Sequence, residues 1–186
     1  MESKQVMGLF IALIMVLSVF GIALEYAFGG GSQNKVKYNG YTFTQGNGEW
    51  TTSYKGKTLS FSVPPDSLES IKLPLDAASL KAVAITYNPS DDFADTLGGA
   101  QYNIQQVLLQ TTDIYPIIGL TNATGTSQEQ ITCETATAST PVIYLMIANT
   151  TEITNENNCV KFSATTPSGL SDEMERFIYA ALGIIK

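Results

Sequence analysis

The chain has 186 residues, 44% of them hydrophobic, which is enough for one modest domain with a buried core and excludes a multidomain enzyme. Asp and Glu number 17 against 10 Lys and Arg, and the formal net charge of −7 argues against a phosphate-binding surface, so we expect no nucleic-acid partner. The sequence contains no histidine, which excludes His-based catalytic triads, His general bases and His metal ligands. We expect a protein that is not an enzyme and carries no cofactor.

The N-terminal part of the sequence has the length and composition of a membrane span. Every residue from Val6 to Leu24 is uncharged, and a transmembrane helix needs about 20 such residues. We expect a short cytoplasmic tail at residues 1–5 and a transmembrane helix at residues 6–28. Signal peptides have shorter apolar regions of about 7–15 residues, which favours an uncleaved anchor. Small residues on either side of Phe28 suit a signal peptidase, so a cleaved, secreted form stays open.

The charges beside this segment predict which side of the membrane the rest of the chain occupies. Lys4 precedes the span and Glu25 follows it, so we expect the N-terminus inside and the C-terminal domain outside the cell membrane. Two Asn-X-Thr sequons, at Asn122 and Asn149, and a pair of cysteines agree with an exported glycoprotein. The sequence therefore predicts a single-pass membrane protein with an extracytoplasmic domain.

A Gly-rich linker is expected at residues 29–36, followed by the extracytoplasmic domain at residues 37–186. The first part of this domain alternates apolar and polar residues around two tight-turn signals, Gly46-Asn47-Gly48 and Lys55-Gly56-Lys57. The pattern predicts a three-stranded antiparallel meander that ends at Pro64-Pro65. The residues expected on its inner face are Tyr41, Phe43, Trp50, Thr52, Tyr54, Leu59, Phe61 and Val63.

A strand and a helix are predicted next. The stretch from Leu80 to Tyr87 alternates as a strand does, and Asn88-Pro89 ends it. Ser90 has the side chain of a helix N-cap, and the acids that follow it suit the first turn of a helix. The apolar stripe expected on this helix comprises Phe93, Leu97, Ala100, Ile104, Val107 and Leu108.

The second half of the domain is predicted to contain a loop, two strands and a closing helix. Residues 121–140 are rich in Thr, Ser, Asn and Gly, which indicates a solvated loop with at most a short strand at 131–133. The apolar run at 141–147 predicts a central strand, paired with a strand at 159–164. Three- and four-residue apolar spacing at 169–185 predicts an amphipathic helix that covers the sheet. The expected fold class is α+β, with one antiparallel sheet and two packed helices.

Two cysteines in a small exported domain pair as a structural disulfide by default, so we expect a bond between Cys133 and Cys159. Nothing near them resembles a Cys-X-X-Cys redox pair, and two cysteines without histidine leave the ligand shell of zinc half empty. The acids Asp91, Asp92 and Asp95 lack the spacing of a calcium-binding loop and are expected to cap the helix instead. No metal site is expected.

Glu49 and Trp50 are candidate ligand contacts, because a carboxylate beside an aromatic platform suits a carbohydrate. A lone Trp in an alternating strand is also typical of a core residue. The pair leaves one alternative function open, that of an exported carboxylate-based hydrolase or carbohydrate-binding module.

Several stretches of the last third carry a family resemblance. They are Thr140–Tyr144, Asn158–Val160, Asp172, Phe177–Tyr179 and Leu182–Ile184. Together with the order of tail, span, aromatic strands, cysteine pair and closing helix, they resemble uncharacterised archaeal single-pass membrane proteins with a disulfide-containing exported domain. The resemblance implies the topology and an archaeal origin, and it implies no activity.

A second resemblance concerns the N-terminus. Gly8 before Leu9, ahead of an apolar segment and a disulfide-containing α+β head, resembles the leader of type IV pilin-like subunits. Leu13 stands where bacterial pilins usually have a glutamate, and the Gly29–Gly31 break would interrupt a helical stalk. A filament subunit is therefore an alternative function. The function we expect is that of a non-enzymatic accessory, interaction or envelope-assembly protein, anchored by residues 6–28 and bound to a protein partner in the envelope.

Overall fold

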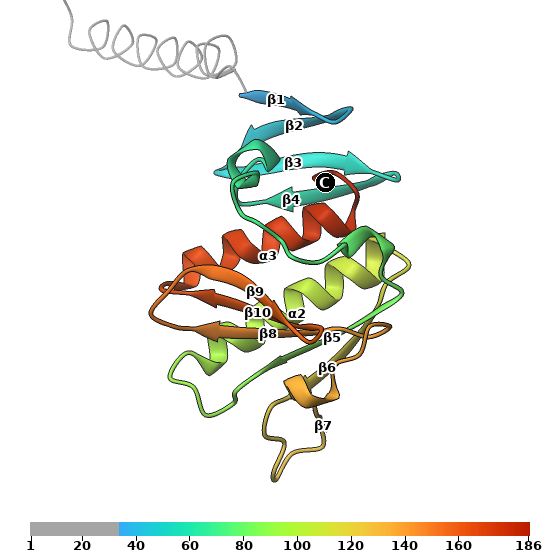
Figure 1. Cartoon of the computed structure of the whole chain (residues 1–186). Helices are drawn as coiled ribbons and strands as arrows, with labels where there is room; N and C mark the ends of the chain where they lie inside the picture. The colour runs from blue at the N-terminus through green and yellow to red at the C-terminus, as the bar shows by residue number, and fades with distance from the viewer. Residues whose placement is uncertain (1–33) are drawn as a thin grey trace, which may run out of the picture. The chain divides into compact units, whose positions relative to one another are not determined.

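The computed structural model describes residues 34–186, which form an α+β fold with two sheets and two α-helices (Figure 1). The predicted tail, the predicted membrane span and most of the predicted linker lie outside the described residues. Within residues 34–186, no helix is both long enough and apolar enough to cross a membrane. An antiparallel sheet and two helices confirm the expected fold class, and the sequence does not predict the second sheet. The helices are α2 (Ala94–Thr111) and α3 (Pro167–Ala181).

The antiparallel sheet has the strand order β1-β2-β3-β4 and contains the predicted meander. Its hairpins turn at Asn39-Gly40, Asn47-Gly48 and Lys55-Gly56, where every residue has a positive φ. Two-residue turns of this kind match the twist of antiparallel strands. The sequence analysis missed β1, which begins at Lys35 within the predicted linker. The strands are β1 (Lys35–Tyr38), β2 (Tyr41–Gly46), β3 (Glu49–Tyr54) and β4 (Lys57–Phe61).

The second sheet has the strand order β7-β6-β5-β8-β10-β9, and its neighbouring strands are parallel except β9 with β10. β8 and β10 pair as expected, with Val142 opposite Cys159, but they run parallel. The reason is that the connection between them contains β9, which pairs with the outer edge of β10. The strands are β5 (Ala82–Tyr87), β6 (Tyr115–Leu120), β7 (Glu129–Gln130), β8 (Val142–Ile147), β9 (Glu152–Glu156) and β10 (Cys159–Ala164).

α3 packs on β8 and β10 with one side and meets the antiparallel sheet with the other (Figure 1). The Thr166 hydroxyl accepts a hydrogen bond from the Gly169 N–H, as the side chain of an N-cap does. Tyr179 stacks on Phe61 with ring centroids 4.2 Å apart, and its hydroxyl donates to the Val63 carbonyl at 2.9 Å. The expectation that the closing helix covers a sheet is confirmed, and a second sheet covers its opposite side.

α2 begins later than the sequence predicts, but most of the expected apolar stripe is confirmed: Leu97, Ile104 and Leu108 are buried, and Ala100 and Val107 pack against the core. Its N-cap is Phe93, whose N–H donates to Asp91 Oδ1 at 2.8 Å, so Asp91 rather than Ser90 supports the helix start. Phe93 was expected in the apolar stripe and is 42% exposed. Gln101 is buried instead, and its Nε2 donates to one carbonyl of β5 and one of β6. Gln101 thus occupies a buried position between two parallel strands. Hydrophobic periodicity does not predict this burial, because the side chain is polar.

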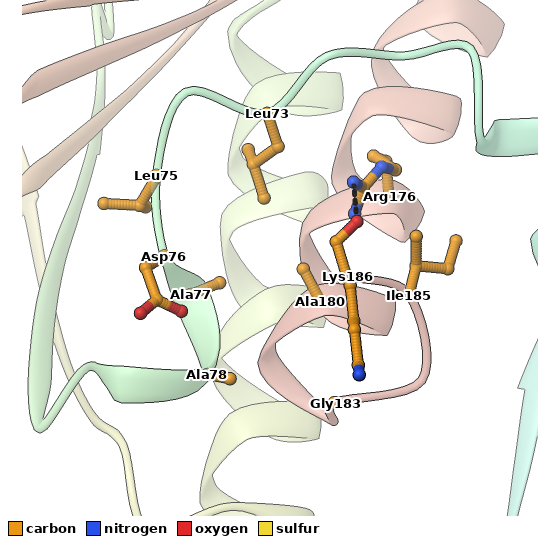
Figure 2. A pocket seen from close by; sticks show the side chains of 10 residues that line it. All are labelled: Leu73, Leu75, Asp76, Ala77, Ala78, Arg176, Ala180, Gly183, Ile185 and Lys186. Carbon is orange, nitrogen blue, oxygen red and sulfur yellow. Dashed lines mark hydrogen bonds between the residues drawn. The ribbon is translucent and has the colours of Figure 1, made fainter. Parts of the chain in front are cut away.

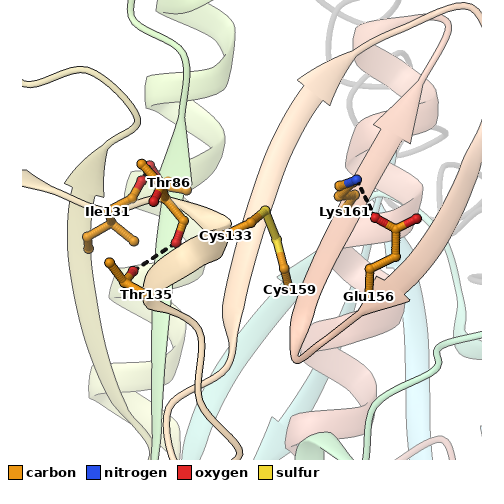
Figure 3. The surroundings of a disulfide bond; sticks show 8 residues. Thr86, Ile131, Cys133, Thr135, Glu156, Cys159 and Lys161 are labelled. Atoms are coloured by element: carbon orange, nitrogen blue, oxygen red, sulfur yellow. Dashed lines mark hydrogen bonds and ion pairs between the residues drawn. A yellow bond between two sulfur atoms is a disulfide. The ribbon is translucent and has the colours of Figure 1, made fainter.

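The loop at residues 121–140 covers part of the sheet face that lies opposite the helices. Ile131 is buried against this face. Cys133 is bonded to Cys159, with the Cα atoms 5.1 Å apart, which confirms the predicted disulfide (Figure 3). The predicted strand at 131–133 is wrong, because the short strand β7 precedes it and Cys133 begins a 3-10 turn. The disulfide therefore joins the loop to the first residue of β10.

Reduction of the disulfide should destabilise the domain. Cys159 is 1% exposed and starts a central strand, and closing a loop of this length stabilises a fold by about 3–4 kcal/mol. We expect the Cys133→Ser/Cys159→Ser variant of the full chain to melt roughly 10 °C lower than the native chain. The measurement is a thermal melt followed by circular dichroism, with and without reductant. Reductant should lower the melting temperature of the native chain alone, and an equal effect on both proteins would contradict the structural role.

Candidate functional site

One face of α3 carries buried charged residues and lies against the segment from Ser70 to Ala78. Glu173, Arg176 and Ala180 are spaced three and four residues apart, so they share this face. Two cavities lie along it, one lined by Arg176 and one by Glu173. Buried ionisable side chains in the wall of a cavity are typical of binding sites, which makes this face of α3 the candidate functional site.

The larger cavity has a volume of about 530 Å³ and is lined mainly by apolar side chains (Figure 2). Arg176 Nε donates to the Ile71 carbonyl at 3.1 Å, and its Nη2 donates to the Lys186 carbonyl at 3.2 Å. Its Nη1 has no hydrogen-bond partner among the described residues. Burial lowers the pKa of Arg176, and the nearby charges of Tyr38 and Glu69 oppose this lowering.

The smaller cavity has a volume of about 360 Å³ and lies between α3, β9 and residues 70–72. Glu173 lines it and is 1% exposed. Both of its carboxyl oxygens are without a hydrogen-bond partner in the part of the chain that the structure describes. Burial, with a smaller contribution from the charges of Glu152 and Asp172, raises the pKa of Glu173 to about 8. The cavity therefore has a carboxyl group in its wall that changes charge near neutral pH.

Glu175, two residues along the same helix, shows how a buried glutamate contributes to the fold. Its carboxylate accepts hydrogen bonds from the Ser62 N–H at 2.6 Å and the Val63 N–H at 3.2 Å. Burial raises the pKa of Glu175, and these hydrogen bonds lower it. Glu175 thus joins α3 to the chain that follows β4. Glu173 makes no equivalent bond within residues 34–186, so no hydrogen bond there compensates for the burial of its carboxyl group.

The structure places the predicted ligand contacts Glu49 and Trp50 apart. They are consecutive residues of β3, so their side chains point to opposite faces of the sheet. Trp50 packs against the core and lies opposite Phe61 in the strand pairing, whereas Glu49 is exposed. A carbohydrate contact here stays a prediction, and the two side chains do not form one platform.

The acids Asp91, Asp92 and Asp95 lie after β5, at the edge where the strand order reverses between β5 and β8. Ligands often bind at such a point in sheets of parallel strands. Asp91, however, accepts the hydrogen bond that starts α2, which agrees with the capping role expected of these acids. Among residues 34–186, no group of three or more Cys, Asp or Glu side chains is placed to hold a metal ion.

The predicted glycosylation sites Asn122 and Asn149 are both exposed. They follow β6 and β8, respectively, in loops rather than in strands or helices. Asn122 Oδ1 accepts a hydrogen bond from the Thr124 N–H within its own sequon. Both sequons are therefore accessible, and their modification stays a prediction.

Comparisons with protein-family models, with curated proteins and with solved structures find no match to this chain. The candidate site is therefore identified from its geometry alone. The sequence analysis missed Glu173 and Arg176, because charges on an amphipathic helix are expected to face solvent. One signal was present: Phe177, Ile178 and Tyr179 are consecutive, and three large apolar residues in a row cannot share one face of a helix. Such a run indicates a helix that is buried on more than one side.

The buried Glu173 carboxyl should make stability depend on pH. Its pKa is about 8 in the folded chain and near 4.5 in the unfolded chain, so the unfolded state loses this proton first as the pH rises. Stability should fall between pH 4.5 and pH 8, by up to about 5 kcal/mol from this group. The Glu173→Gln variant should lose this dependence and melt at a higher temperature than the native chain at pH 8.5. Their melting temperatures should converge near pH 4.

The control for this measurement is Glu134→Gln, because Glu134 is exposed in the 121–140 loop. Its melting temperature should follow that of the native chain at every pH. A constant difference between the native chain and Glu173→Gln across the whole range would show that Glu173 titrates as an ordinary glutamate.

Proposed function

We propose that the chain is a membrane-anchored extracytoplasmic protein whose exported domain binds a protein partner in the cell envelope and has no enzymatic activity. The outer face of α2 is the observation that carries the binding role. The large apolar side chains that are exposed among residues 34–186 all belong to α2 and its two flanking segments. Their exposed fractions are 42% for Phe93, 63% for Tyr102, 53% for Leu109 and 65% for Tyr115.

Tyr102 and Leu109 are two helical turns apart, so they lie on the same face of α2. The other sides of the helix pack against β5, β6 and α3, which leaves this face towards solvent. From Thr96 to Thr112 the sequence contains no charged residue. Protein interfaces are rich in aromatic residues and poor in charge at their centre, and this face of α2 has both properties.

The chemistry of the α2 face indicates what binds there. A helix that lies on a membrane surface usually carries Lys or Arg on its polar side, and α2 has neither. An exposed surface of tyrosine, leucine and amide side chains is matched best by an uncharged protein surface that buries the apolar groups and pairs the amides. We therefore assign the face to a neutral surface of a protein partner.

The disulfide supports the location outside the cytoplasm. Disulfides persist in oxidising compartments, and the bond between Cys133 and Cys159 joins two elements of the folded domain. The exposed sequons at Asn122 and Asn149 agree with this location. The predicted span at residues 6–28, which is uncharged from Val6 to Leu24, supplies the anchor, with the N-terminus inside the cell.

Photo-crosslinking tests the binding face. With p-benzoylphenylalanine in place of Tyr102 or Leu109 in the native membrane, we expect one defined crosslinked product containing a second protein. The same group at Ser53, which is exposed on β3, should not give this product. Adding Leu109→Asp should remove the product formed from position 102 and leave the melting temperature unchanged, because Leu109 is outside the core. Equal products from all three positions would contradict the proposal. A crosslinked product of two copies of this chain would show that the face binds a second copy instead of a different protein.

The N-terminus of the mature protein tests the anchor. We expect mass spectrometry of the membrane fraction to find residues 1–28 intact, and protease added outside the cell to digest residues 34–186. A mature protein that starts at Leu9 would indicate a pilin-like subunit instead. A start close to Gly30, with the protein in the medium, would show that the domain is secreted.

A further inference from the structure

We propose that the cavity between α3, β9 and residues 70–72 binds an aliphatic ammonium group, with Glu173 as its counterion. This goes beyond the proposed function, because it concerns a different ligand and different elements from the outer face of α2.

Glu173 has the properties of a ligand-binding acid. Its side chain is 1% exposed, it lines a cavity of about 360 Å³, and neither carboxyl oxygen has a hydrogen-bond partner in the described part of the chain. A buried carboxyl group without partners destabilises a protein. Glu175 on the same helix avoids this destabilisation, because its carboxylate accepts two hydrogen bonds from backbone N–H groups. A ligand that donates hydrogen bonds into the cavity would do the same for Glu173.

The charges around the cavity favour a cation. Glu152 lines it together with Glu173, and Asp172 lies close enough to affect the charge of Glu173. Lys72 is the single basic residue among the described residues that line the cavity, and its side chain is exposed. The formal net charge of −7 also attracts cations to the domain. An anion would have to approach Glu152 and, once it ionises, Glu173, so the charges at the cavity do not favour an anion.

The remaining lining residues favour an ammonium group on an aliphatic stem over a metal ion. Ser70 and Thr151 line the cavity, and the Thr151 hydroxyl is bonded to Thr165. An ammonium group has three N–H donors to share between a carboxylate and a hydroxyl acceptor such as that of Ser70. Ile71 and Ile153 add apolar surface on which methylene groups can pack. Among the described residues, no three acidic or Cys side chains come together as the ligands of a metal ion.

Two sources can supply this group: a free alkylamine, or the lysine side chain of another protein. Both present the same ammonium and methylene groups, so the cavity recognises them by the same chemistry. Lys72 is a third candidate within the chain itself. In the structure its Nζ makes no hydrogen bond to Glu173, but its side chain is flexible and reaches the same cavity.

The experiment is isothermal titration calorimetry of the full chain in detergent, with n-butylammonium and with N-acetyl-lysine methylamide as separate probes. We expect saturable binding of at least one probe. n-Butanol, which has the same stem without the charge, should not bind. Affinity should increase from about pH 6 to about pH 9, because the carboxylate form of Glu173 is the one that binds. Glu152, Asp172 and Lys72 are the other titratable groups near Glu173.

Two glutamate variants distinguish specific binding in the cavity from nonspecific attraction of a cation to an acidic protein. Glu173→Gln keeps the shape of the side chain and removes its charge, and we expect it to weaken binding about tenfold to a hundredfold. Glu134→Gln changes the net charge equally at an exposed position outside the cavity and should bind as the native chain does. Equal binding by native chain and Glu173→Gln would overturn the proposal, as would the absence of saturable binding by either probe.

Lys72→Met tests the internal alternative. If an external ammonium group is the ligand, removing the nearby positive charge should leave binding intact or strengthen it. If binding occurs in Lys72→Met and is absent from the native chain, Lys72 itself occupies the cavity and the external site is disproved. Tighter binding of n-butylammonium than of the lysine derivative identifies a free amine, and the reverse order identifies a lysine of a protein.

Discussion

The burial of α3 between two sheets is the constraint on which the rest of the structure depends. A helix that is covered on both sides has to satisfy its polar side chains with partners from the protein. Tyr179 and Glu175 do so through the backbone that follows β4, and Arg176 does so through two carbonyls. The bonds of Tyr179 and Glu175 hold the end of the antiparallel sheet against the helix. Among the buried polar side chains of α3, Arg176 leaves one nitrogen unpaired, and Glu173 alone makes no hydrogen bond at all within the described residues.

The opposite face of the six-stranded sheet is covered by other means. No α-helix among residues 34–186 packs there, and the 121–140 loop covers part of it through Ile131 and the disulfide. A Thr- and Ser-rich loop buries little apolar surface. The disulfide to β10 therefore holds the loop in place. Gly119 of β6 allows the loop to approach, because a Cβ atom there would lie 2.5 Å from the Glu129 carbonyl oxygen. The disulfide is therefore part of what covers this face of the sheet.

The sequence predicts the local elements well and the long-range ones poorly, for a physical reason. The meander depends on two-residue turns such as Asn47-Gly48, whose signal lies within a few positions. Parallel pairing of β5 with β8 joins strands that are far apart in sequence, and no local pattern specifies it. The candidate site was missed for the same reason. The hydrogen bond from Tyr179 to Val63 spans 116 positions, and only such contacts show which elements bury the second side of α3.

The two proposed binding regions place different demands on the fold. The outer face of α2 is uncharged and exposed, so substitutions at Tyr102 or Leu109 change a surface and leave the core intact. Glu173 lies in the protein interior, where its ionisation and its ligand both alter stability. A ligand that binds the ionised carboxylate must therefore stabilise the folded chain most at alkaline pH, where the unpaired charge is most unfavourable. A cavity whose carboxyl group does not bind the ligand has no such coupling. The pH dependence of ligand-induced stabilisation therefore distinguishes a carboxyl group that binds a ligand from one that is merely buried.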